Sequence, residues 1–371
     1  MGAIRILHGI FAKQKYGAET VILRLFRYID RSRYQFDFLV PYNCREVDYE
    51  TEVESLGGHV YRQYYHFTEK KLPGYLSPED LWKIHPEIQG WHFNSSYYGV
   101  CNTQLMVAAQ KIGLPIRIIH AHNSAAPNYR KEAQHLALRP FAQQYANRLL
   151  ACSKEAGSWH FPRKQFEVFP NAVDAAMFAF NETVRNRIRK EAGVDNKLTI
   201  GYVGRLVKQK NPKFLLDILR EVNRRCDYAH LVLVGDGYME DDVRHRAQEM
   251  GLENISFAGR VENVNEWMQG FDVLLLPSRF EGLGVVLIEA QASGLPCFAS
   301  DQVPVEAAVT NRLTYLSLKE PAEWADAILR ADFTYDRNRG YDEVVAAGYD
   351  IRESAKRLEA IYDELLARQG K

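Results

Sequence analysis

The sequence predicts an α/β protein built from two doubly wound domains, each with a parallel sheet covered by helices on both faces. Short apolar runs alternate with stretches of helical periodicity along the whole 371-residue chain, as in successive βαβ units. Each half of the chain contains enough apolar runs for a sheet of its own. The length by itself allows roughly two to three domains.

The strands are expected where short apolar runs are bounded by polar or turn-forming residues. In the first half they are Ile4–His8, Phe36–Val40, His59–Arg62, Gly90–Phe93, Ile116–His120, Arg148–Ala151 and Phe166–Phe169. In the second half they are Leu198–Val203, Leu231–Val234, Ile255–Ala258, Val273–Leu276 and Cys297–Ser300.

The boundary between the domains is expected near residues 173–197, where the chain becomes polar and charged before a fresh strand begins. We place the first domain at residues 1–175 and the second at 176–351. A final helix at 352–371 carries an apolar stripe, and we expect it to pack back on the first domain. This stripe consists of Ala355, Leu358, Ile361, Leu365 and Leu366.

A helix at residues 17–31 has one apolar face and one basic face. The apolar face holds Val21, Ile22, Leu25, Phe26 and Ile29. Arg24, Arg27 and Arg31 lie almost opposite. Together with the basic and aromatic run at residues 64–71, these arginines would suit an anionic membrane surface. A solvated helix face explains them equally well, so both interpretations stay open.

Composition excludes several classes of protein. The chain has 47 Lys+Arg against 47 Asp+Glu and no apolar run long enough for a transmembrane helix. Its start lacks the long apolar segment of a secretory signal. The five cysteines are scattered and never form a CxxC pair, which favours reduced thiols in the cytoplasm over disulfides or zinc. No domain is basic enough to indicate nucleic-acid binding.

The sharpest motif spans residues 279–296, RFEGLGVVLIEAQASGLP, directly after a buried-type strand. It places Glu281 and Glu289 on either side of a glycine turn that ends at Gly284. A helix that begins there presents free N–H groups from Leu283 to Val286, which suit an anion. The two carboxylates suit sugar hydroxyls. Taken alone, the same residues would more often be a helix cap and solvated surface.

A second motif, GYVGRLVKQKNP at residues 201–212, is a strand followed by a glycine turn and two cations. Asn211-Pro212 has the pattern of a helix N-cap with proline at the first position. Arg205 and Lys210 therefore lie at the carboxyl end of the strand, where open α/β sheets bind ligands. A guanidinium and an ammonium beside helix N-termini suit a diphosphate. Taken alone, two such cations would more often belong to a solvated basic loop.

Two further segments belong with these motifs. One is a turn at residues 168–178, in VFPNAVDAAMF, and the other is a third glycine turn at the end of a strand, at residues 231–244 in LVLVGDGYMEDDVR. Neither that strand nor the first strand of the chain ends in GxGxxG, which argues against a dinucleotide-dependent dehydrogenase.

Residues 148–302 resemble glycosyltransferase family 4, the retaining, nucleotide-sugar-dependent enzymes of GT-B architecture, with two Rossmann-like domains and a cleft between them. The family's segments occur in order: a strand that ends in Ser153, P-N-x-V-D, G-R-L-x-x-x-K, F-x-G and P-S-x-x-E-G-x-G, with the second glutamate at E-x7-E spacing. The likeness is weaker in the first half, where YGAE at 16–19 and RIIHAHNS at 117–124 are similar to the branch that makes exopolysaccharides and capsules.

The resemblance assigns roles to individual residues. Arg205 and Lys210 would bind the donor diphosphate, Glu289 the ribose, and Glu281 the donor sugar. The F-x-G turn at 257–261 would contact the nucleobase. The expected donor-binding set is Gly17, Arg205, Lys210, Gly259, Arg260, Glu281, Leu283, Gly284, Val285 and Glu289, and the expected catalytic set is His122, Glu281, Arg205 and Lys210. His122 is preferred over His120 because it leads into the turn after the strand.

The resemblance implies a hexosyltransferase that retains the anomeric configuration and uses a nucleotide sugar, with UDP favoured over GDP. The leaving phosphate oxygen would help to take the acceptor proton. The expected acceptor is a glycan or a lipid-diphosphate-linked oligosaccharide, at the inner face of the membrane. Because no DxD pair follows a strand of the expected pocket, we expect no metal, and no cofactor beyond the substrate. The alternatives are an epimerase or phosphorylase of the same fold, or a non-catalytic partner that binds nucleotide sugars.

Two departures from the family pattern affect local detail. Asn171 is followed by Ala172 where the family usually has glycine, and the glycine-rich segment usual after residues 303–306 is missing. We therefore expect an altered turn at the first position and an altered edge of the donor pocket at the second.

Overall fold

The protein is described from a computed structural model, which covers residues 2–9, 17–41, 46–63, 78–96, 98, 100–126 and 128–368. It divides into two compact units. Unit 1 comprises Met1–Ala172 and Ile351–Lys371, and unit 2 comprises Val173–Asp350. Unit 2 begins three residues before the expected boundary because Val173 forms a bridge with Asp350, its N–H donating to Tyr349 O at 3.0 Å.

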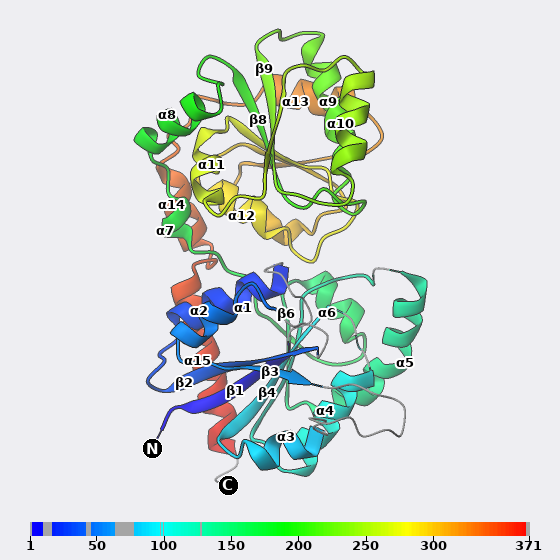
Figure 1. The fold of residues 1–371 in the computed structure, drawn as a ribbon, viewed down its shortest axis with the longest axis vertical. Coiled ribbons are helices and arrows are strands. Elements are labelled where there is room, and N and C mark those ends of the chain that lie inside the picture. Colours follow the sequence, from blue (N-terminus) through cyan, green and yellow to red (C-terminus); the bar gives the residue numbers. More distant parts are fainter. Residues whose placement is uncertain are drawn as a thin grey trace. The chain divides into compact units, whose positions relative to one another are not determined.

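Within its described residues, unit 1 has a seven-stranded parallel sheet in the order β3-β2-β1-β4-β5-β6-β7 (Figure 1). Its strands are β1 (Ile4–Gly9), β2 (Tyr34–Pro41), β3 (Val60–Gln63), β4 (Ile88–Ser95), β5 (Ile116–Ala121), β6 (Arg148–Ala151) and β7 (Glu167–Val168). Its helices are α1 (Gly17–Tyr28), α2 (Glu50–Ser55), α3 (Pro78–Ile84), α4 (Val100–Lys111), α5 (Tyr129–Tyr145), α6 (Lys154–His160) and α15 (Ile351–Ala367).

Unit 2 has a six-stranded parallel sheet in the order β10-β9-β8-β11-β12-β13, counted over residues 173–350. Its strands are β8 (Leu198–Val203), β9 (Ala229–Val234), β10 (Ile255–Gly259), β11 (Val273–Leu276), β12 (Cys297–Ser300) and β13 (Leu313–Leu316). Its helices are α7 (Ala175–Phe178), α8 (Glu182–Glu191), α9 (Pro212–Asn223), α10 (Glu240–Glu249), α11 (Val264–Gly270), α12 (Val285–Ala292), α13 (Pro321–Leu329) and α14 (Arg339–Ala346), with a 3-10 turn at Val305–Ala307.

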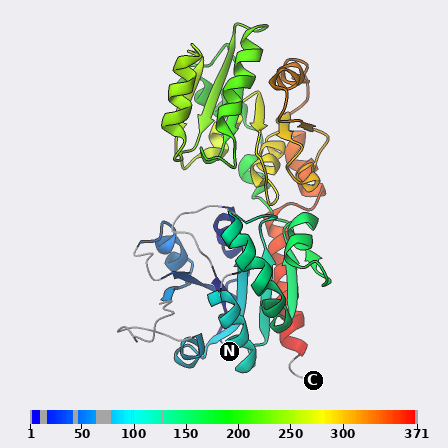
Figure 2. The ribbon, with the colours of Figure 1, turned by 90° about the vertical axis from the view of Figure 1, so that its right-hand side faces the viewer.

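The last helix, α15, packs on the core of unit 1, as the sequence predicts (Figure 2). Its buried face joins the apolar face of α1 and the strands beneath. Ile351, Ala355, Leu358, Ile361, Tyr362 and Leu365 form that face. At the rim, Tyr34 donates its hydroxyl to Asp363 at 2.6 Å, and Arg33 pairs with the same carboxylate at 2.6 Å. The returning chain therefore belongs physically to unit 1.

Helix α1 ends at Tyr28, three residues earlier than predicted. The chain turns at Asp30, whose N–H donates to Glu359 of α15 at 2.8 Å and whose carboxylate accepts from Ser32 N at 3.0 Å. Side-chain oxygens thus replace the helical hydrogen bonds and stop the helix. Arg31 consequently lies in the turn rather than on the helix.

In both sheets, the order in which successive strands are added reverses next to the first strand. In unit 2, β8 lies between β9 and β11; in unit 1, β1 lies between β2 and β4. Loops on the two sides of such a point leave the sheet in opposite directions, which opens a crevice at the carboxyl ends of the strands. This topology positions the residues of the candidate site.

None of the described helices has the length and apolar character needed to cross a bilayer.

Candidate functional site

The loops after β8 and β11 meet at the switch point of unit 2. Nζ of Lys210 lies 2.5 Å from Oε1 of Glu281, and the two side chains are only 16% and 8% exposed. The structure therefore brings together two residues of the predicted site that are 71 positions apart in the chain. Removal of one partner from a pair that is shielded from solvent in this way is costly, because a mostly buried charge then loses its nearest opposite charge.

Two further residues fasten these loops to each other. Gln209 donates from Nε2 to Phe280 O at 2.9 Å, and its own carbonyl accepts from Arg279 N at 2.8 Å. Arg279 also donates to Oδ1 of Asn211 at 3.2 Å. These contacts hold Lys210 and Glu281 at a fixed distance. Sequence reasoning missed Gln209, because a glutamine in a polar loop carries no distinguishing pattern.

Arg205 is exposed at the start of the same loop. Its carbonyl accepts a hydrogen bond from the hydroxyl of Tyr202 at 2.8 Å, and Leu206 N donates to Asp236 O at 2.7 Å. Burial and the negative charge of Glu281 raise the pKa of Tyr202, while Arg205 lowers it. The phenol therefore stays protonated and anchors the backbone that carries the guanidinium.

Gly284 provides the turn into α12, which begins at Val285 where the sequence predicts a helix. Its φ of 79° lies in the left-handed region, which glycine adopts without strain. A Cβ there would lie 3.3 Å from both Leu287 Cδ1 and Val303 Cγ1. The first turn of α12 directs its N–H groups to the carboxyl edge of the sheet, which favours an anion.

The remaining donor-site candidates of unit 2 lie on three different elements. Glu289 is buried on α12, one turn beyond its start, and Leu283 is buried just before the helix. Gly259 ends β10 with a φ of 67° and open space at the Cβ position, and the exposed Arg260 follows it. The structure gives these positions, and their roles stay a prediction.

His122 follows β5 in unit 1 and lies between two asparagines. Its Nε2 is 3.2 Å from Oδ1 of Asn94, and its Nδ1 is 3.1 Å from Oδ1 of Asn171. Sequence reasoning missed Asn94, although a polar residue near the end of the otherwise buried strand β4 could have drawn attention to it. Gly17, the predicted site residue of the first loop, begins α1 in the same unit. Tyr16 and the run at residues 64–71 lie outside the described residues.

The contacts of Asn94 determine which nitrogen of His122 carries the proton. Nδ2 of Asn94 lies 3.3 Å from His92 O and 3.2 Å from Nδ1 of His8. A carbonyl oxygen can only accept, so Nδ2 of Asn94 must face it, and Oδ1 must face His122. Nε2 of His122 is therefore the donor. Its Nδ1 must then accept, so the amide NH₂ of Asn171 takes the position next to it.

Burial keeps this imidazole neutral. It lowers the pKa of His122 to about 4. We expect ring ¹⁵N NMR shifts to report a neutral Nε2–H imidazole at pH 5, where an ordinary histidine with a pKa of about 6.5 is mostly protonated. The urea-unfolded protein is the control, and its histidines should titrate near that ordinary value. Titration of His122 near 6.5, or a proton on Nδ1, would contradict the arrangement.

His120 is fully buried beside His122, with ring centroids 4.1 Å apart and Nε2 3.3 Å from Phe169 O. His92 and His8 continue this row of rings into the core, and Nδ1 of His92 lies 2.9 Å from the Tyr362 hydroxyl of α15. Desolvation lowers the pKa values of His8, His92 and His120 well below the ordinary range. These three rings are therefore neutral packing groups.

Within the described ranges, no three His, Cys, Asp or Glu side chains are arranged to hold a metal ion. Cys152, Cys226 and Cys297 are buried and form no disulfide, and burial raises the pKa of Cys297 to about 12. A thiol with so high a pKa is a poor metal ligand and a poor nucleophile.

Comparison with known proteins places this geometry in context. The family model described as "Glycosyl transferases group 1" matches residues 197–331. The putative glycosyltransferase EpsF of Bacillus subtilis (strain 168) is 31% identical over 373 residues, which cover 97% of this chain and 96% of that protein. The UDP-Gal:alpha-D-GlcNAc-diphosphoundecaprenol alpha-1,3-galactosyltransferase of Escherichia coli is 28% identical over 226 residues, or 57% of each chain.

Among solved structures, Anabaena Alr3699/HepE in complex with UDP superimposes with a TM-score of 0.81 at 17% sequence identity, covering 97% of this chain and 100% of that one. The same protein in complex with UDP-glucose gives a TM-score of 0.80. This likeness confirms the predicted GT-B architecture of two Rossmann-like domains.

Proposed function

The chain belongs to the glycosyl transferases group 1 family, and from this premise we propose that it is a retaining, metal-independent hexosyltransferase of family 4. The observation that carries the proposal is the shielded Lys210–Glu281 pair, 2.5 Å apart, beside the N-terminus of α12 at the switch point of unit 2. A cation next to free helix N–H groups binds a diphosphate, and a carboxylate next to it binds sugar hydroxyls.

In the proposed reaction, the bond between the anomeric carbon and the diphosphate oxygen breaks while the acceptor oxygen attacks the same face of the sugar. The leaving phosphate oxygen takes the acceptor proton, so neither glutamate has to act as a nucleophile. Lys210, Arg205 and the start of α12 stabilise the charge that develops on the diphosphate. The proposal gives the neutral imidazole of His122, positioned by Asn94 and Asn171, the role of orienting the donor sugar.

We propose a UDP-sugar as the donor, because Anabaena HepE, which has this fold, is described in complex with UDP and with UDP-glucose. We propose a lipid-diphosphate-linked glycan as the acceptor, because the Escherichia coli relative is a galactosyltransferase for a diphosphoundecaprenol-linked sugar. The product would then serve exopolysaccharide or capsule synthesis on the cytoplasmic side of the membrane.

A two-step experiment tests the function. Thermal shifts with a panel of UDP- and GDP-sugars identify the donor, and release of the free nucleotide is then measured with and without lipid-diphosphate-linked acceptors. A transferase releases nucleotide quickly only when an acceptor is present, and NMR of the product reports retention. Rearrangement of the donor sugar without an acceptor would instead identify an epimerase, and binding without any turnover a non-catalytic partner.

We also propose peripheral contact with an anionic membrane through Arg24, Arg27 and Arg31. Arg27 is already paired with Glu52 at 2.6 Å, and Arg31 donates to Arg27 O at 2.8 Å, so the attraction must come from the net field of this surface rather than from three free side chains.

The triple Arg→Ser variant of these three residues is expected to sediment less with anionic liposomes, by roughly tenfold or more at about 1 kcal/mol per charge. The matched control removes three arginines from unit 2, at Arg220, Arg224 and Arg330, and should bind as the wild type does. If both triple variants bind anionic liposomes equally, the proposed membrane contact through Arg24, Arg27 and Arg31 is wrong.

A further inference from the structure

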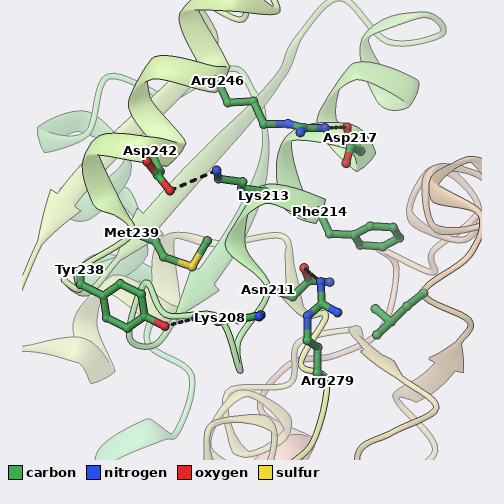
Figure 3. A pocket seen from close by; sticks show the side chains of 11 residues that line it. Lys208, Asn211, Lys213, Phe214, Asp217, Tyr238, Met239, Asp242, Arg246 and Arg279 are labelled. Carbon is green, nitrogen blue, oxygen red and sulfur yellow. Dashed lines mark hydrogen bonds and ion pairs between the residues drawn. The ribbon is translucent and has the colours of Figure 1, made fainter.

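A second pocket of about 590 Å³ lies entirely within unit 2 (Figure 3). Its walls come from the loop between β8 and α9, the loop between β9 and α10, the first two turns of α9 and α10, and the loops after β11 and β13. Lys210 and Glu281 do not line it. The pocket is therefore separate from the candidate donor site, although both use the loop that follows β8.

The charges around this pocket do not cancel. Two carboxylates line it, and each already has a cation: Asp242 pairs with Lys213 at 3.1 Å, and Asp217 pairs with Arg246 at 2.7 Å. These two ion pairs cross its upper part in Figure 3. Such pairs are locally neutral, so they leave the electrostatic character of the pocket to its other charged residues.

Two cations remain without an acidic partner among the residues that the structure describes, Lys208 and Arg279. The backbone N–H of Lys208 donates to the hydroxyl of Tyr238 at 3.0 Å, and among the described residues no carboxylate pairs with its ammonium. The guanidinium of Arg279 donates to the neutral amide of Asn211 at 3.2 Å. Both line the lower half of the pocket and reach toward Asn211 (Figure 3). An ammonium and a guanidinium at one end of a cavity favour a phosphate or a carboxylate.

The backbone at this end is held in an unusual conformation. Asn211 has a φ of 55°, and it is the single non-glycine residue with a positive φ in the described part of the chain. N–H groups of Lys210 and Asn211 both donate to Val207 O, at 3.0 and 3.2 Å. The turn therefore directs Lys210 to the donor site and Asn211 to the second pocket. Such a conformation costs free energy of order 1 kcal/mol or more, and is typical of functional sites.

Beside Lys208 the pocket offers the face of an aromatic ring. Tyr238 is 76% exposed, which is unusual for a side chain of its size, and its hydroxyl is anchored to Lys208 N. Phe214 and Met239 add apolar surface nearby. An exposed aromatic face next to amide and carboxylate groups suits a pyranose ring, which has apolar C–H faces and polar hydroxyl edges.

We propose that this pocket binds an anionic saccharide, with its phosphate or carboxylate on Lys208 and Arg279 and its ring against Tyr238. The ligand is either a free sugar phosphate or an acidic residue within a glycan, since both present the same chemistry. This inference does not depend on the proposed transferase activity, because it concerns the binding of a ligand by residues other than Lys210 and Glu281.

Calorimetric titrations of the full-length protein, one series without UDP and one with saturating UDP, test the proposal. The probes are glucose 6-phosphate, a glucuronate-containing tetrasaccharide, glucose and inorganic phosphate. One of the first two is expected to bind at least tenfold more tightly than glucose or phosphate alone, and the tighter of them identifies the source of the ligand. Failure of both to bind, or their displacement by UDP, would overturn the proposal.

Three variants locate the binding. The double variant Lys208→Ala/Arg279→Ala should weaken binding of the preferred probe by at least about tenfold, since two charge-assisted contacts are lost. Tyr238→Ala should weaken it roughly fivefold, whereas Tyr238→Phe keeps the ring and should retain the affinity.

The double variant Arg220→Ala/Arg330→Ala is the matched control, because it removes two exposed positive charges of unit 2 away from the pocket. Thermal melting of each variant checks the fold. If the pocket and control variants lose affinity equally, or if Tyr238→Ala binds as tightly as Tyr238→Phe, the assigned site is wrong.

Discussion

Replacement of Lys210 with alanine is expected to reduce kcat by about 10²–10³-fold and to weaken the binding of UDP. The ammonium is fixed 2.5 Å from Glu281 by a loop that Gln209 fastens at both its amide and its carbonyl. A positive charge that is already in place stabilises a leaving diphosphate without any reorganisation. Its loss removes that stabilisation from the bound nucleotide and, more strongly, from the transition state, where negative charge on the diphosphate increases.

Single-turnover kinetics and calorimetry with UDP measure the two effects separately. Lys190→Ala removes an exposed lysine of the same unit and should behave as the wild type does. Lys210→Met/Glu281→Gln removes both charges at once, so it shows whether a loss in Lys210→Ala comes only from an uncompensated Glu281. If Lys210→Ala turns over as fast as the wild type, the donor diphosphate does not bind at Lys210.

The strands were predictable because buried parallel strands are nearly continuous apolar runs. Arg148–Ala151, Leu198–Val203, Val273–Leu276 and Cys297–Ser300 have the same bounds in the structure as in the prediction. β13 was missed because it is the edge strand of its sheet and is only partly buried, so it lacks the fully buried apolar run of β11 and β12. The end of α1 was also misplaced, because the turn depends on Glu359, more than three hundred residues away.

Only those features of the candidate site that depend on a few neighbouring residues could be predicted from the sequence. Strand-end turns and a glycine before a helix identify Lys210, Glu281 and Gly284 as neighbours of a sheet edge, because each signal lies within a few residues. The pairing of Lys210 with Glu281 depends on which strands are adjacent, and no single sequence states that order. The contact between Asn94 and His122 has the same origin, since β4 and β5 are neighbours only in the folded sheet.

Replacement of Glu281 with alanine or glutamine should reduce turnover without weakening the binding of UDP, whereas replacement of Lys210 impairs both. The carboxylate occupies Lys210 while no donor is bound, and it repels a diphosphate. Its removal frees the ammonium, so the affinity for UDP is expected to stay the same or rise by a few fold. Turnover should nevertheless fall by about 10²-fold or more, because the sugar loses a charged hydrogen-bond acceptor.

The contrast between the two variants is the decisive measurement. Calorimetry with UDP, which lacks the sugar, isolates the diphosphate contacts, while kcat with the intact donor includes those to the sugar. A double-mutant cycle over Lys210→Ala and Glu281→Ala should be strongly non-additive, because the two side chains are in direct contact. An equal loss of UDP affinity and turnover in Glu281→Ala would place this carboxylate at the nucleotide instead of the sugar. Additive losses would mean that the two side chains do not act as a unit.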